Sequence, residues 1–198
     1  MGEDLARAFV SFFAIVDPLG NVVVFYLLTQ RFDAPRRLQV AAAAIATAFL
    51  MLVLFSVGGT EVLDVLGISP DSFQVAAGLL LLPPAFQLIT HGQSMETDAQ
   101  QALAPIELAL VPLATPLLAG PGALAAAISF SDSVGAGTTI LGLTLVLIIA
   151  FLLFVVAEWL FRLVGPVLMR LLSRIVGILL FAIAIDFILE GARAFFDL

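Results

Sequence analysis

The sequence contains no cysteine, no lysine and one histidine, and only 12% of its 198 residues are charged. Without cysteine the chain can form neither a disulfide nor a thiolate metal site. A soluble domain has about 25% charged and about 45–50% apolar residues, whereas this chain is 62% apolar and has a mean hydropathy of +1.19. The composition excludes the soluble classes and predicts an integral membrane protein surrounded by a lipid bilayer.

Enzyme motifs are also missing. The chain has no H-E-x-x-H, no G-x-S-x-G, no P-loop and no glycine-rich dinucleotide fingerprint. A net charge of −7 opposes binding to nucleic acid. We therefore expect no catalytic residue, no cofactor and no bound metal apart from a coupling ion. An intramembrane enzyme built on Asp17 and Asp186 is an alternative without a supporting motif.

Long apolar runs are abundant, and six of them are separated by polar segments. A transmembrane helix needs about 20 apolar residues, and these runs lack the apolar–polar alternation of barrel strands. The sequence predicts an all-α integral membrane protein, a single membrane domain over residues 1–198 with six transmembrane helices. The predicted spans are residues 5–29, 38–57, 73–89, 103–128, 138–161 and 175–189.

Arginines are distributed unevenly around these spans. Because cytoplasmic loops are enriched in Arg and Lys, the loops after the first, third and fifth spans are predicted to be cytoplasmic. Both termini then lie outside a plasma (inner) membrane that the chain crosses several times. Six arginines fall in those three loops and two on the opposite side: Arg31, Arg36, Arg37, Arg162, Arg170 and Arg174 against Arg7 and Arg193.

A weak internal repeat relates residues 74–92 to residues 173–191 at an offset of 99 residues. It aligns Gly78 with Gly177, Ile89 with Ile188 and Gln87 with Asp186; the alternative is chance similarity in an Ala- and Leu-rich chain. We expect two three-helix repeats, about 1–98 and about 99–198. An odd number of spans inverts the second copy, and inverted repeats with broken helices are typical of secondary transporters.

The first span contains Asp17-Pro18-Leu19-Gly20-Asn21 at its middle. Asp before Pro is typical of a helix start, because Asp caps and Pro fits the first turn. One helix should therefore end here and another begin, with Gly20 allowing close backbone approach. Asp17 and Asn21, at i,i+4, are candidate ligands for a substrate or for a coupling ion such as Na⁺ at Asp17; the alternative is that Asp17 only caps the helix.

The fourth span is interrupted in a similar way, since it carries three prolines between residues 111 and 122. Thr115-Pro116 and Gly120-Pro121-Gly122 are two candidate points at which a half-helix restarts. Its free N–H groups and positive dipole end would bind an anionic group such as a carboxylate. The alternative is a proline-kinked helix without a site.

Three further polar positions lie in or near the predicted spans. Asp186 near the outer end of the sixth span is either a proton-relay carboxylate or a residue that reaches the headgroups. Its repeat partner Gln87 follows Pro83-Pro84, which should kink the third span. Glu158 and Arg162 are predicted to form an i,i+4 ion pair.

Three motifs resemble the MarC family of membrane proteins: residues 12–20 (FFAIVDPLG), 111–122 (VPLATPLLAGPG) and 174–180 (RIVGILL). The resemblance covers nearly the whole chain. It implies a six-span bundle in a bacterial or archaeal cytoplasmic membrane and a place in the LysE-type exporter superfamily, in which some members are described as transporters of small neutral amino acids. Pro83-Pro84 and Asp186 depart from the family pattern.

Together these features predict a secondary transporter of a small solute, with small neutral amino acids favoured. Their carboxylate would meet the half-helix between Thr115 and Gly122, and Asp17 with Asn21 would take the ammonium group or the coupling Na⁺ or H⁺. The direction of transport and the oligomeric state stay open. The alternatives are a small-solute channel and a structural or regulatory membrane protein without transport activity.

Overall fold

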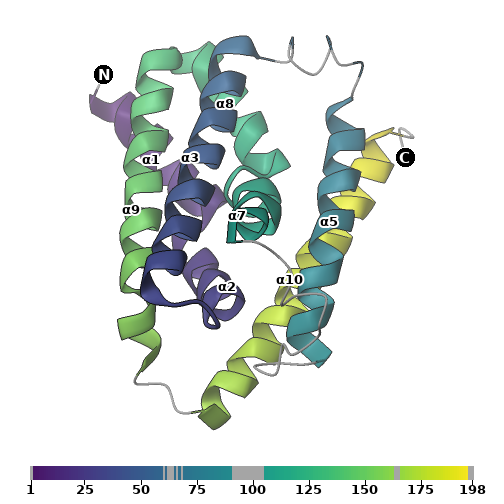
Figure 1. The fold of residues 1–198 in the computed structure, drawn as a ribbon. Helices are drawn as coiled ribbons and strands as arrows, with labels where there is room; N and C mark the ends of the chain where they lie inside the picture. Colours follow the sequence, from purple (N-terminus) through teal and green to yellow (C-terminus); the bar gives the residue numbers. More distant parts are fainter. Residues whose placement is uncertain are drawn as a thin grey trace.

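The computed structural model describes residues 2–59, 61, 65, 67, 69–90, 105–162 and 166–195. Within these ranges every regular element is helical, as the composition predicts (Figure 1). The elements are α1 (Gly2–Val16), α2 (Pro18–Thr29), α3 (Ala34–Gly58), α5 (Pro70–Thr90), α7 (Pro105–Leu108), the distorted segment η1 (Ala109–Leu118), α8 (Pro121–Val134), α9 (Ala136–Arg162) and α10 (Pro166–Phe195).

These elements supply five or six membrane spans. Five apolar helices are long enough to cross a bilayer, counting α1 and α2 as one. A sixth span forms if Pro105–Leu118 and Pro121–Val134, which are bent by 57° relative to each other, cross together. The start of α1 and the end of α10 lie at the same end of the molecule (Figure 1), as an even number of crossings requires.

Helix α9 contacts α1, α2, α3 and α8 and so joins them into one bundle. Aromatic rings fill the space between them. Phe25 of α2 stacks on Phe154 of α9 with ring centroids 4.2 Å apart, and Phe12 of α1 meets Phe130 of α8 at 5.4 Å. Since Phe12, Phe25 and Phe154 are fully buried, these contacts fix how α1, α2 and α8 sit against α9.

Helices α5 and α10 form a separate antiparallel pair beside this bundle (Figure 1). A Cβ on Gly78 would lie 2.8 Å from Ile188 Cγ1, and a Cβ on Gly177 would lie 2.9 Å from Ile89 Cγ1. Glycine therefore lets the two backbones approach closely. The 99-residue offset relates Gly78 to Gly177 and Ile89 to Ile188, so it converts one of these contacts into the other. Inverted copies would show this relation, and the inverted repeat itself stays a prediction.

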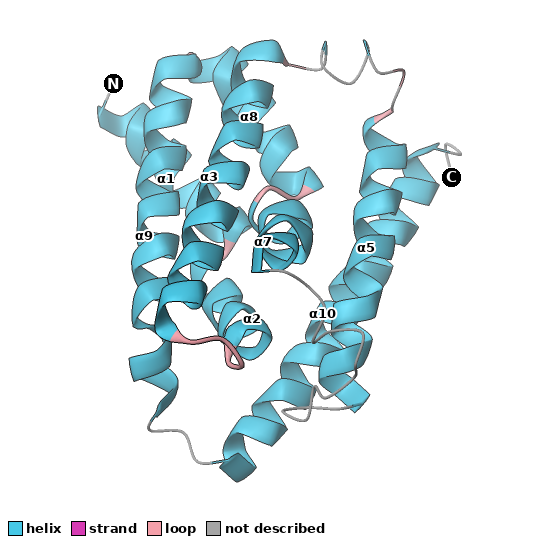
Figure 2. Ribbon diagram, viewed as in Figure 1, coloured by secondary structure: helices cyan, strands magenta, loops and turns pink. Residues whose placement is uncertain are grey.

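Helix α5 continues as one helix through Pro83 and Pro84, as the predicted span over residues 73–89 does, and the kink expected there stays a prediction. One predicted loop, in contrast, is helical. The polar segment after residue 128, predicted to be a loop, is helical as far as Val134, and Gly135 alone (φ 86°) separates α8 from α9. The serines do not end α8, because the hydroxyl of Ser131 donates to the Ser56 carbonyl of α3. Figure 2 shows how short the described loops are.

Candidate functional site at two broken helices

The first break lies at Asp17, where the backbone turns left-handed (φ 44°) between α1 and α2. The side chain caps α2, because Asp17 Oδ1 accepts a hydrogen bond of 2.9 Å from the Gly20 N–H, while Pro18 occupies the first turn. The predicted break and cap are confirmed. Gly20 is required by this geometry, since a Cβ there would collide with Asp17 Oδ2.

Asn21 stabilises the same break from the other side. Its Nδ2 donates a 2.6 Å hydrogen bond to the Val16 carbonyl at the end of α1, and the residue is 7% exposed. A carbonyl freed inside a span must find a partner within the protein. Asn21 thus satisfies the broken backbone, whereas the Asp17 side chain is exposed.

The second break separates η1 from α8. Val111 and Thr115 have extended backbone angles (φ −134° and −130°), in keeping with the restriction on a residue before proline; both X-Pro bonds, at Pro112 and Pro116, are cis. Of the two predicted restart points, the one at Gly120-Pro121-Gly122 begins α8. The Thr115 hydroxyl instead contacts Met51 Sδ of α3 at 2.9 Å.

The two breaks lie next to each other, at the middle of the molecule (Figure 2). A Cβ on Gly122, in the first turn of α8, would be 3.6 Å from Ile15 Cγ2, two residues before Asp17. A Cβ on Gly120 would collide with the Pro116 carbonyl, so glycine is needed for the chain to turn here. The structure therefore brings together two features that the sequence places about 100 residues apart.

A cavity of about 620 Å³ begins at this junction and follows α8. Pro121 and Gly122 are the predicted site residues among its described lining, which also includes polar side chains that the sequence reasoning missed. Their signal in the sequence is a helical spacing that continues beyond residue 121, which the polar composition of residues 129–137 hides. The missed polar residues are Gln74, Ser129, Asp132 and Ser133.

A second cavity of about 260 Å³ adjoins the first and shares Ile128 and Asp132 with it. Its lining is more polar and includes Glu61. On the opposite wall of the larger cavity, Gln74 Nε2 of α5 donates to Glu190 Oε2 of α10 at 3.0 Å. The larger cavity thus has its polar groups away from the helix breaks and apolar walls closer to them.

The other predicted site residues lie elsewhere. Asp186 is exposed on α10, although its neighbour Phe187 has Cε2 3.9 Å from the position of a Gly120 Cβ. The side chain of Gln87 lies outside the described residues. Over the described ranges, no group of three or more His, Asp or Glu residues is arranged to hold a metal ion. Glu158 pairs with Arg37 of α3 at 2.7 Å, whereas the side chain of Arg162, its predicted partner, is not described.

The fold and the site define a multi-spanning α-helical membrane protein with two adjoining broken helices. The family model described as "MarC family integral membrane protein" matches residues 3–196. The chain belongs to the MarC family of integral membrane proteins.

Relatives of this chain occur in archaea and bacteria. It is 35% identical to a UPF0056 membrane protein of Methanocaldococcus jannaschii over 193 residues, covering 94% of each chain. It is 33% identical to one of Archaeoglobus fulgidus, covering 93% of this chain and 90% of the relative. It is 30% identical to the UPF0056 membrane protein YhcE of Escherichia coli, covering 96% and 92%. No solved structure matches the chain.

Proposed function

We propose that the protein is a secondary transporter of a small solute and that the solute binds where the two broken helices meet. Small neutral amino acids are the favoured substrate class, with Na⁺ or H⁺ as the coupling ion. One observation carries the proposal: the uncapped start of α8 opens into a cavity of about 620 Å³ beside the break at Asp17.

The start of α8 suits a carboxylate. Pro121 has no N–H, and the first hydrogen bond within the helix runs from the Leu124 N–H to the Gly120 carbonyl at 3.0 Å. The N–H groups of Gly122 and Ala123 precede it and have no acceptor within the helix. Gly122 is exposed and lines the cavity, so its N–H and the positive end of the helix dipole are available to an anion.

Asp17 suits the opposite charge. Its Oδ1 is used by the cap, which leaves Oδ2 to attract a solute ammonium group or a coupling cation. Placing a charged carboxylate at the middle of a membrane costs about 2.5–3.5 kcal/mol on insertion scales. A role in binding explains why this charge is retained at a position where neutral asparagine would also cap.

The cavity offers a route from the end of the molecule where α8 ends to the junction of the two broken helices. It extends from Pro121 to Ser133, a distance of roughly 18 Å along a helix that rises 1.5 Å per residue. The wall close to the junction is apolar, with Leu124 and Ala125 next to Gly122. A channel would need polar groups along the whole route, so this lining favours a binding site over a continuous pore.

Uptake of labelled glycine, alanine and serine into proteoliposomes tests the proposal, under Na⁺ and proton gradients applied separately. We expect gradient-driven uptake by the unmodified protein. Asp17→Asn should abolish most uptake while the protein still folds, because an asparagine oxygen can accept the same Gly20 N–H and tolerates a left-handed backbone. Absence of uptake under every gradient would contradict the amino-acid assignment.

A matched pair of glycine substitutions distinguishes loss of uptake by blocking the site from loss of uptake by damage to a helix. Gly122→Leu fills the inner end of the cavity, whereas Gly137→Leu in the first turn of α9 has nothing within 4 Å of its Cβ position. The first variant should lose uptake and the second should retain it. Equal uptake by both would place the solute site elsewhere.

A further inference from the structure

A groove runs between α3 and α9, away from the two helix breaks. Two cavities follow each other along these helices, one of about 190 Å³ and one of about 390 Å³. Their lining residues repeat every three or four positions, between 34 and 49 on α3 and between 144 and 158 on α9. The two cavities therefore lie in line along the same faces of α3 and α9, and we term them together the α3–α9 groove.

The α3–α9 groove is apolar along most of its length. Its wider part is lined on α3 by Ala42, Ile45, Ala46 and Phe49. Thr144 is the polar residue in the facing wall, and its hydroxyl is used by the Ile140 carbonyl at 2.6 Å. Fifteen residue steps along α3 correspond to roughly 22 Å at 1.5 Å per residue, more than the ~15 Å of hydrocarbon in one leaflet of a 30 Å core.

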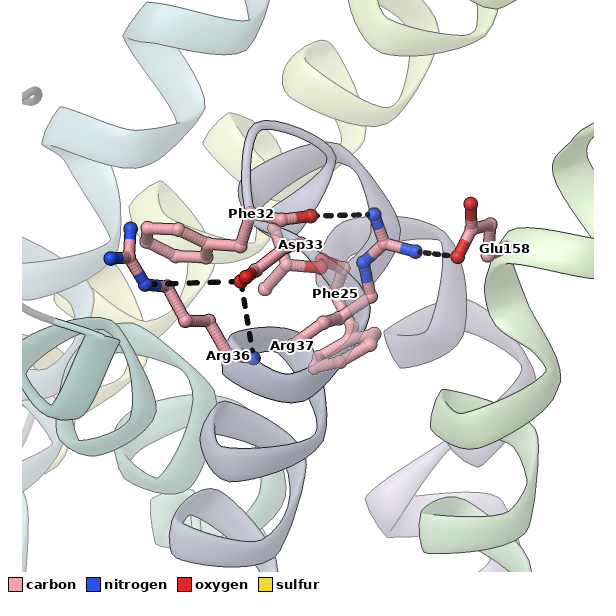
Figure 3. Close-up of polar contacts among 7 residues, drawn as sticks. Phe25, Phe32, Asp33, Arg36, Arg37 and Glu158 are labelled. Atoms are coloured by element: carbon pink, nitrogen blue, oxygen red, sulfur yellow. Dashed lines mark hydrogen bonds and ion pairs between the residues drawn. The ribbon is translucent and has the colours of Figure 1, made fainter.

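One end of the groove carries opposite charges. Arg37 Nη1 donates to Glu158 Oε2 at 2.7 Å, and Arg37 Nη2 donates to the Phe32 carbonyl at 3.0 Å (Figure 3). Arg37 lies close to the start of α3 and Glu158 close to the end of α9, so the pair sits where a span leaves the hydrocarbon. Asp33 and Arg36 lie at the same turn and pair with each other at 3.8 Å.

Arg37 and Glu158 are the charged residues among the described lining of the groove, and the accessible one of the two is the carboxylate. Arg36 and Asp33 are also exposed, but they pair with each other outside this lining. The side chain of Arg37 is 10% exposed, whereas that of Glu158 is 49% exposed. A headgroup whose only charge is its phosphate would place that negative charge beside this carboxylate, and the two would repel each other. A headgroup that carries an ammonium group can instead place that group on Glu158, with the buried Arg37 guanidinium behind the carboxylate.

We propose that the α3–α9 groove binds one phospholipid with a primary ammonium headgroup, of the phosphatidylethanolamine type. One acyl chain lies against Ala42, Ala46 and Phe49, and the headgroup engages the Arg37–Glu158 pair. Two complementary features carry this assignment. The groove is as long as a lipid chain and as apolar, and its single charged end has an exposed carboxylate backed by a buried cation.

Native mass spectrometry of the purified protein tests the proposal, with phosphatidylethanolamine, phosphatidylcholine and phosphatidylglycerol of identical acyl chains added in equal amounts. We expect retention of one phosphatidylethanolamine in preference to phosphatidylglycerol by about two- to fivefold, the range for a partly exposed ion pair. Glu158→Gln should abolish the preference. Equal retention of the three lipids by the unmodified protein would overturn the headgroup assignment.

A second pair of variants locates the chain without disturbing the ion pair. Ala46→Phe fills the groove, and Ala182→Phe adds the same ring at an exposed position of α10, outside the groove. The first should lose the retained lipid and the second should keep it. Unchanged lipid retention by Ala46→Phe would overturn the proposal. It would also be overturned if the unmodified protein were a dimer without bound lipid and Ala46→Phe made it monomeric, because a second copy of the chain would then cover the groove.

Discussion

Asp17 illustrates how a single residue can break a membrane helix and repair the break. Its backbone takes the left-handed conformation that asparagine and aspartate tolerate best after glycine, and its carboxylate satisfies one N–H of the helix that follows. Gly20 leaves room for that carboxylate, and Asn21 satisfies the Val16 carbonyl of the helix that precedes. The break therefore depends on the identities of these three residues together.

This dependence predicts opposite effects of Gly20→Ala in two backgrounds. In the otherwise unmodified protein, the new Cβ displaces the Asp17 carboxylate and should destabilise the fold by about 0.5–2 kcal/mol, the usual cost of a lost N-cap. In an Asp17→Ala background, the three nearest atoms, all from Asp17, are removed. There Gly20→Ala should stabilise the fold by up to about 1 kcal/mol through helix propensity. Unfolding curves in detergent measure both; effects of equal size and sign would argue against this coupling.

At the scale of the elements, α5 and α10 pack through glycines rather than through interdigitated large side chains. Lipid tails are as apolar as leucine, so close backbone contact is what favours helix association in a membrane. Gly78 and Gly177 both provide such contact, and in each case the neighbouring atoms include backbone of the other helix: the Ala184 carbonyl and the Ile89 nitrogen. Backbone atoms cannot rotate away from an added methyl group.

Gly78→Ala and Gly177→Ala should therefore each destabilise the protein by about 1–3 kcal/mol, the cost of overpacking a tight contact. Gly137→Ala is the control, since a methyl group there meets open space. Thermal unfolding of the three variants in the same detergent compares them. If all three unfold at the same temperature, glycine packing does not hold α5 against α10.

Local residue patterns predicted the elements better than their contacts. Asp17-Pro18 and Gly120-Pro121-Gly122 mark both helix starts correctly, because capping and proline geometry act over a few residues. The ion pair of Arg37 with Glu158 joins residues 121 positions apart and depends on how α3 packs against α9, so an i,i+4 neighbour was predicted instead. Asp132 was missed because its polar neighbours resemble a loop in sequence, although their hydroxyl groups bond to carbonyls within the fold.

At the scale of the whole molecule, the helices place the arginine-rich segment at the start of α3 at one end. The turn before α3 lies at the opposite end from the turn between α8 and α9 (Figure 1). The first contains Arg31 and is followed at once by Arg36 and Arg37 at the start of α3, and the second contains Gly135 without any basic residue. The positive-inside tendency predicts that the end with the arginines faces the cytoplasm.

Because the chain has no cysteine, a single introduced thiol reports this orientation. A membrane-impermeant maleimide added to intact cells should label Gly137→Cys, at the start of α9, and leave Arg36→Cys unlabelled until the cells are opened. Both positions are exposed. The reverse labelling pattern would show that the protein has the opposite orientation.

The central claim is that a solute occupies the junction of the two broken helices, and a thiol at Gly122 tests it most directly. We predict that Gly122→Cys reacts with a small thiol reagent through the cavity, and that glycine, alanine or serine slows this reaction. Labelling of Gly137→Cys should be unaffected by the same amino acids. Equal labelling of Gly122→Cys with and without each amino acid, in protein that remains folded, would contradict a solute site at this junction.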